Sequence, residues 1–106
     1  MIVRGGIYEI RAMRSPRGDE QAGKRLAVII QSDRFATSTV TLALTSTSAG
    51  PAVYRPLVDI AGQATRILTD QIYTVNPTRL GAFCGVLDPD ELIDLDRALL
   101  LKLGLI

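Results

Sequence analysis

Apolar and polar residues alternate along most of the chain with the two-residue period of half-buried β-strands. This pattern predicts strands over residues 7–13, 39–45, 72–75 and 82–87, and weaker strands over 53–58 and 63–69. The run from Leu26 to Ile30 is continuously apolar, which is typical of a strand buried on both faces. Pro56 has no backbone N–H to donate, so its strand is predicted to lie at a sheet edge.

The period changes near the C-terminus. The stretch Asp88-Pro89-Asp90-Glu91 has the layout of a helix start, with a capping residue, Pro at the first position and Glu three residues after the cap. A helix is predicted from Pro89 to about Leu103, with Gly104 ending it. The residues expected on its apolar face are Leu92, Leu95, Leu99 and Leu103, and Ile93, Leu100 and Leu101 widen that face.

Short strands followed by one helix predict a mainly β fold, a small and partly open antiparallel barrel. At 106 residues the chain is expected to form a single domain, residues 1–106. Turn-forming residues between 14 and 24, and again between 45 and 51, predict two polar loops. Cys84 lies in an apolar run and is expected to be a small buried hydrophobe.

The chain contains no histidine. That composition excludes Ser-His-Asp and Cys-His catalysis and nearly all zinc sites, and no other residue cluster predicts a metal or a cofactor. No apolar run approaches the roughly 20 residues of a membrane span, and no signal peptide is evident, so a cytoplasmic location is predicted.

The formal net charge is only +1, so any basic surface has to be local. Residues 1–25 contain six basic and three acidic residues, whereas residues 88–96 contain five acidic residues and no basic one. The N-terminal quarter can therefore present a positive face, and the alternative is that both charged stretches are ordinary solvated surfaces.

The most specific motif is Glu-Gln-Ala-Gly-Lys-Arg-Leu-Ala-Val-Ile-Ile-Gln-Ser at residues 20–32, a polar loop with a carboxylate that leads into a strand opened by Arg. It closely resembles the loop and second strand of the MazF/PemK family of toxin endoribonucleases. Taken alone, Glu20 is more simply a solvated loop residue, and Arg25 a residue capping a strand edge. The resemblance implies instead that Arg25, Glu20 and Thr45 are catalytic.

The chemistry fits these roles. The guanidinium of Arg25 can bind two phosphate oxygens at once. Glu20 can accept the proton of a ribose 2′-hydroxyl, directly or through a water. The hydroxyl of Thr45 can donate to a phosphate oxygen, with Ser46 as a second donor.

A second stretch, Asp70-Gln71-Ile72-Tyr73-Thr74-Val75, resembles another strand of the family. In the PemK branch this Asp is assigned a catalytic role together with an Arg two residues earlier, where this chain has Leu68. That departure favours the arrangement of Glu20, Arg25 and Thr45. Asp70 and Gln71 are then expected to line the RNA groove or to support strand packing.

Two other positions depart from the family pattern. The opening Arg4-Gly5-Gly6-Ile7-Tyr8 is similar to the family's Arg-Gly-Glu-Ile-Trp, with Gly6 in place of Glu and Tyr8 in place of Trp. Leu26 replaces the Pro that usually follows the active-site Arg. Because Leu leaves the backbone φ unrestricted, Arg25 is expected to be held less rigidly and activity to be lower.

The resemblance implies a homodimeric toxin of a toxin–antitoxin pair. It would cut single-stranded RNA at a short sequence, without metal, and leave 2′,3′-cyclic phosphate and 5′-hydroxyl ends. Arg14, Arg17 and Lys24 are expected to contact phosphates. The expected protein partner is a MazE-like antitoxin whose disordered acidic segment covers the groove.

Two rival functions belong to other classes. One is a non-enzymatic gyrase-binding toxin like CcdB, which acts through a C-terminal Trp-Gly-Ile, whereas this chain has no Trp and ends Leu103-Gly104-Leu105-Ile106. The other is a catalytically weak homologue that binds RNA or an antitoxin. Both predict that Arg25→Ala leaves toxicity intact.

Overall fold

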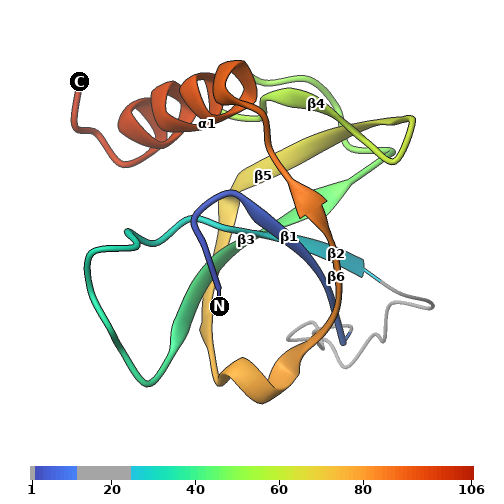
Figure 1. Ribbon diagram of the computed structural model, residues 1–106. Coiled ribbons are helices and arrows are strands. Elements are labelled where there is room, and N and C mark those ends of the chain that lie inside the picture. Colours follow the sequence, from blue (N-terminus) through green and yellow to red (C-terminus); the bar gives the residue numbers. More distant parts are fainter. Residues whose placement is uncertain (1, 12–24) are drawn as a thin grey trace, which may run out of the picture.

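The computed structural model describes residues 2–11 and 25–106. Its strands are β1 (Gly6–Ile10), β2 (Arg25–Ile29), β3 (Val40–Ser46), β4 (Leu57–Ile60), β5 (Gln63–Val75) and β6 (Leu80–Val86). They form one antiparallel sheet in the order β4-β5-β3-β2-β1-β6. The sheet curls into a nearly closed barrel, and the helix α1 (Pro89–Lys102) lies across one end beside β4 (Figure 1). The predicted fold class is confirmed.

The sheet buries apolar residues on both faces. Along β2, the side chain of Val28 joins a cluster that includes Leu95 and Leu99 of α1. The neighbouring Ala27 and Ile29 point the opposite way, into a second cluster formed by strands alone. Burial of β2 on both faces is thus confirmed, and it fixes the strand whose first residue is Arg25.

The strand β5 differs from its prediction. Residues 63–69 and 72–75 were expected to form two strands, but they form one strand of 13 residues. Leu44 pairs with Leu68 while the adjacent Ala43 pairs with Ile72, so residues 69–71 form a bulge that has no partner in β3. A bulge interrupts the ladder without ending the strand, which the sequence pattern did not reveal.

The predicted strand over residues 53–58 was wrong in position. Residues 53–55 form a turn, and β4 begins at Leu57, directly after Pro56. Because β4 pairs with β5 alone, it is an edge strand, as Pro56 predicted.

The helix start is confirmed in detail. The Asp88 carboxylate accepts a hydrogen bond from the Glu91 backbone N–H at 2.8 Å, and the Glu91 carboxylate accepts one from the Asp88 N–H at 3.0 Å. The second carboxylate oxygen of Glu91 accepts from the Asp59 N–H, which ties α1 to β4. Gly104 follows the helix with a φ of 72°, a conformation that favours glycine.

The predicted apolar face of α1 is only partly correct. Leu95 and Leu99 are buried and Leu92 is half-buried, but Leu103 is 56% exposed because the helix ends one residue before it. Ala98 is buried although the pattern did not select it.

Cys84 is exposed, so the expectation of burial was wrong. The strand β6 pairs only with β1 and forms the other edge of the sheet. Within the described ranges, no other element of the chain covers the outer side chains of β6. Phe83, one of them, is 57% exposed.

The packing of α1 against the sheet gives a first prediction. Leu95→Ala should lower the free energy of unfolding by about 2–5 kcal/mol, because it opens a cavity between α1 and the sheet. Ile93→Ala, at a position 54% exposed on the same helix, should change it by less than about 0.5 kcal/mol. Urea unfolding of the two variants measures the difference, and equal losses would contradict the packing described.

Candidate active site

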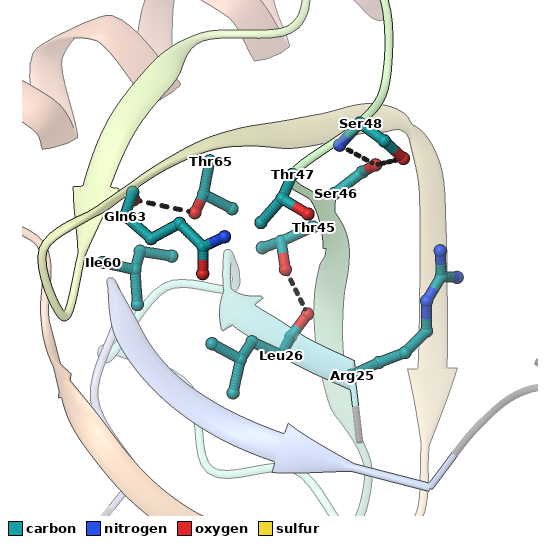
Figure 2. A pocket seen from close by; sticks show the side chains of 9 residues that line it. All are labelled: Arg25, Leu26, Thr45, Ser46, Thr47, Ser48, Ile60, Gln63 and Thr65. Carbon is teal, nitrogen blue, oxygen red and sulfur yellow. Dashed lines mark hydrogen bonds between the residues drawn. The ribbon is translucent and has the colours of Figure 1, made fainter. Parts of the chain in front are cut away.

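A pocket of about 360 Å³ opens where β2 begins and β3 ends. Its walls come from the first residues of β2, the end of β3 with the loop that follows, and the β4–β5 hairpin (Figure 2). The lining residues are Arg25, Leu26, Thr45, Ser46, Thr47, Ser48, Ile60, Gln63 and Thr65. Three of the predicted site residues, Arg25, Thr45 and Ser46, therefore line one pocket.

Arg25 is the first residue of β2 and is half-buried. In the antiparallel β2–β3 ladder, Ala27 pairs with Leu44. Extending this register by two residues, back along β2 and forward along β3, sets Arg25 opposite Ser46. Ser46 in turn pairs with Arg66 of β5. Residues directly opposite share a sheet face, so Arg25, Ser46 and Arg66 form one polar row across three strands.

The Thr45 hydroxyl is hydrogen-bonded within the protein. The Thr45 side chain is 6% exposed, and the hydroxyl donates to the Leu26 carbonyl oxygen at 2.7 Å. The single hydroxyl proton is thus used within the protein. Figure 2 shows the Arg25 guanidinium directed away from Thr45. Thr45 instead fixes the backbone of the residue next to Arg25.

Ser46 keeps a proton to donate. Its hydroxyl oxygen accepts from the backbone N–H groups of Ser48 at 3.1 Å and Ala49 at 2.9 Å, and lies 3.4 Å from the Ser48 hydroxyl oxygen. Two acceptor positions are therefore filled, while the hydroxyl hydrogen can turn toward Ser48 or toward a bound anion.

Four predicted residues, Glu20, Arg14, Arg17 and Lys24, lie outside the described residues. The structure therefore gives no geometry for the predicted base or for the predicted phosphate contacts. Their roles stay predictions.

Asp70 and Gln71 are not among the residues that line the pocket. Both belong to the bulge in β5. Asp70 forms a bidentate ion pair with Arg55, whose Nε lies 3.1 Å from Oδ1 and whose Nη2 lies 2.8 Å from Oδ2. The absence of an Arg two residues before Asp70 had argued against an Asp–Arg pair, but another part of the chain supplies the Arg.

Arg55 was not predicted from the sequence, because it stands 15 residues before Asp70, at the end of the turn over residues 53–55. No periodic pattern links the two positions. Only the pairing of β4 with β5 brings them together.

The ion pair changes the proton affinities of both groups. The hydrogen bonds from Arg55 lower the pKa of Asp70 below its usual value, and the charge of Lys102 acts in the same direction. The hydrogen bond to Asp70 raises the pKa of Arg55. Asp70 is therefore an ionised structural partner at neutral pH and a poor proton acceptor.

Within residues 2–11 and 25–106, the structure contains no group of three or more Cys, Asp or Glu side chains that could hold a metal ion. In the same ranges, no helix has both the length and the apolar character required to cross a membrane.

The barrel and its C-terminal helix are those of known toxin structures. An endoribonuclease from a mycobacterial species, solved with its cognate antitoxin, superposes with a TM-score of 0.81 at 19% identity and covers 100% of this chain and 98% of its own. MazF from Deinococcus radiodurans gives 0.77 at 17% identity, with 97% and 96% covered, and toxin MazF-mt6 from Mycobacterium tuberculosis gives 0.75 at 18%, with 93% and 96% covered. These identities establish the fold alone.

The sequence establishes the family. The model for the PemK-like, MazF-like toxins of type II toxin–antitoxin systems matches residues 3–103. A toxin candidate of Mycobacterium tuberculosis, Rv3098A, is 40% identical over 106 residues, covering 99% of this chain and 100% of that protein. The chain therefore belongs to the PemK-like, MazF-like toxins of type II toxin–antitoxin systems.

The lowered pKa of Asp70 gives a second prediction. Because folding depresses this pKa, the ion pair stabilises the native state above the unfolded pKa of about 3.9, and the stabilisation is lost as pH falls through the folded value. The difference in melting temperature between the parent and Asp70→Asn should be largest near pH 7 and shrink below about pH 4. Thermal unfolding from pH 3 to pH 7 measures it, and a constant difference would contradict the assignment.

Proposed function

We propose that this toxin is a sequence-specific, metal-independent endoribonuclease. It cleaves single-stranded RNA by attack of a ribose 2′-hydroxyl on the adjacent phosphate, which yields 2′,3′-cyclic phosphate and 5′-hydroxyl ends. The observation that carries the proposal is the pocket where Arg25 opens β2 opposite Ser46, in a chain of the MazF-like family. Structural neighbours named endoribonucleases support the same activity.

Each candidate site residue has one role in the proposed reaction. Arg25 binds the phosphate and stabilises the charge that develops in the transition state, and Ser46 donates a further hydrogen bond. Glu20 removes the 2′-proton. Thr45 holds the start of β2 through the Leu26 carbonyl and so positions Arg25.

RNA recognition extends beyond the pocket. Arg14, Arg17 and Lys24 contact phosphates and supply affinity, whereas Gln71, from the β5 bulge, contacts the bases. The toxin acts as a homodimer in the cytoplasm, where it arrests growth. Its protein partner is a MazE-like antitoxin, in keeping with the antitoxin bound to the mycobacterial neighbour.

The direct test is cleavage of a long defined RNA in excess EDTA. The parent should cut at a short sequence and leave 5′-hydroxyl ends. Arg25→Ala should reduce the rate by at least about 10²-fold, because it removes the phosphate ligand. Arg97→Ala, which removes the same charge from an exposed position on α1, should leave the rate unchanged.

The outcome against the proposal is intact RNA with the parent protein, together with Arg25→Ala as toxic in cells as the parent. That result would favour a toxin that acts by binding, or an inactive homologue.

The position of Thr45 gives a separate prediction. Thr45→Val keeps the shape but loses the hydrogen bond to Leu26, so it should shift Arg25 and slow RNA cleavage by about 10-fold. Thr45→Ser retains the hydroxyl and should stay within a few-fold of the parent. Single-turnover cleavage rates measure both, and equal rates for the two variants would show that the hydroxyl does not act through this bond.

A further inference from the structure

The segment between β3 and β4, residues 47–56, forms part of the pocket wall through Thr47 and Ser48. Its last residues are bonded to β5. The Ile67 N–H donates to the Pro56 carbonyl at 3.0 Å, and the Thr69 hydroxyl donates to the Tyr54 carbonyl. The second half of the segment is therefore fixed to β5, whereas its first half carries the pocket residues.

Arg55 joins the two halves. Its Nε and Nη2 donate to the Asp70 carboxylate, while its Nη1 donates to the Gly50 carbonyl at 3.3 Å. The Arg55 carbonyl in turn accepts from Nη1 of Arg66 at 3.0 Å. One guanidinium thus connects the middle of the segment to the bulge in β5.

The charges around Asp70 make this connection depend on its carboxylate. Asp70 faces Arg55 directly and is also within the electrostatic reach of Lys102, whose ammonium lies 4.8 Å from the Tyr54 ring centre. The Arg55 guanidinium carbon lies 5.7 Å from the same ring centre. Without the carboxylate, Arg55 and Lys102 would both lose the anion that their charges stabilise.

Asp70 is poorly placed to contact RNA. Arg55 occupies one acceptor position on each carboxylate oxygen, and the side chain is only 19% exposed. A carboxylate would also repel a phosphate at this position. Its contribution to RNA recognition is therefore best explained through the segment that Arg55 holds.

We propose that Asp70 and Arg55 are positioning residues that hold segment 47–56 against β5, place Thr47 and Ser48 in the pocket wall, and thereby set which RNA sequence is cut. This inference rests on the proposed function. It gives an ion pair outside the pocket a role in the sequence specificity of cleavage. It replaces the expectation that Asp70 contacts RNA itself.

The test compares Asp70→Asn, Arg55→Gln and the double variant with the parent. Asp96→Asn is the matched control, because it weakens a 2.7 Å ion pair with Arg4, and both residues of that pair lie outside segment 47–56 and β5. Two quantities are measured on each protein. One is backbone hydrogen exchange over residues 47–55, and the other is the ratio of cleavage at the preferred RNA sequence to cleavage at single-base variants of it.

Each single substitution should speed exchange in the segment and lower the cleavage preference by about 10-fold, mainly through kcat for the preferred sequence. The double variant should lose no more cleavage preference than the single variant with the larger loss, because the two residues act as one unit. Asp70→Glu, which keeps the charge, should recover part of the preference, and Asp96→Asn should match the parent in both measurements.

Losses that multiply to about 100-fold in the double variant would show that Asp70 and Arg55 act independently, and would overturn the inference. Parental exchange rates in the single variants would also overturn it. If the parent cuts RNA and Arg25→Ala does not, while Asp70→Asn keeps the parental preference, this inference alone fails. If the parent cuts no RNA, the proposed function fails, and the claim about cut-site selection fails with it. Hydrogen exchange then still tests whether Asp70 and Arg55 hold segment 47–56 in place.

Discussion

The bulge at residues 69–71 of β5 is the constraint on which the rest of the structure depends. Side chains alternate along a regular strand, so Leu68 and Ile72 would share a face without it. With the bulge, Leu68 packs in the cluster formed by strands alone and Ile72 packs against the cluster below α1. Adjacent residues of β3, Leu44 and Ala43, can then each meet a partner of the correct face. One long strand thereby serves both layers of the core.

The bulge also creates the polar contacts beside the pocket. Its first residue, Thr69, is 1% exposed and uses its hydroxyl on the Tyr54 carbonyl, and its second residue, Asp70, binds Arg55. In the described ranges no buried side-chain polar atom lacks a hydrogen-bond partner. The polar residues that a bulge removes from the ladder are thus satisfied by the segment before β4, which joins the fold of the barrel to the shape of its pocket.

The pocket combines rigid and adjustable parts. Arg25 begins a strand that is buried on both faces, and the Thr45 hydroxyl is hydrogen-bonded to the backbone of the next residue, so the proposed phosphate-binding side chain starts from a well-packed strand. Thr47 and Ser48 come instead from an irregular segment held by side-chain bonds. An irregular segment tolerates substitution more readily than a buried strand, so this part of the pocket wall can change while the strand is kept.

The sequence by itself determined the class of fold, the helix and its cap, and the edge position of β4, because each depends on local period or on the chemistry of one residue. Both signals are local in the sequence. The capping box joins Asp88 to Glu91, three residues apart, and the missing N–H of Pro56 affects only the strand that follows it. It also selected Arg25, Thr45 and Ser46 as candidate site residues, through a resemblance rather than through spacing, and these three line one pocket. Tertiary structure alone decided the use of the Thr45 hydroxyl, the exposure of Cys84 on an edge strand and the pairing of Asp70 with Arg55. Those features depend on strand order and register, which bring together residues far apart in the chain, and no local pattern encodes them.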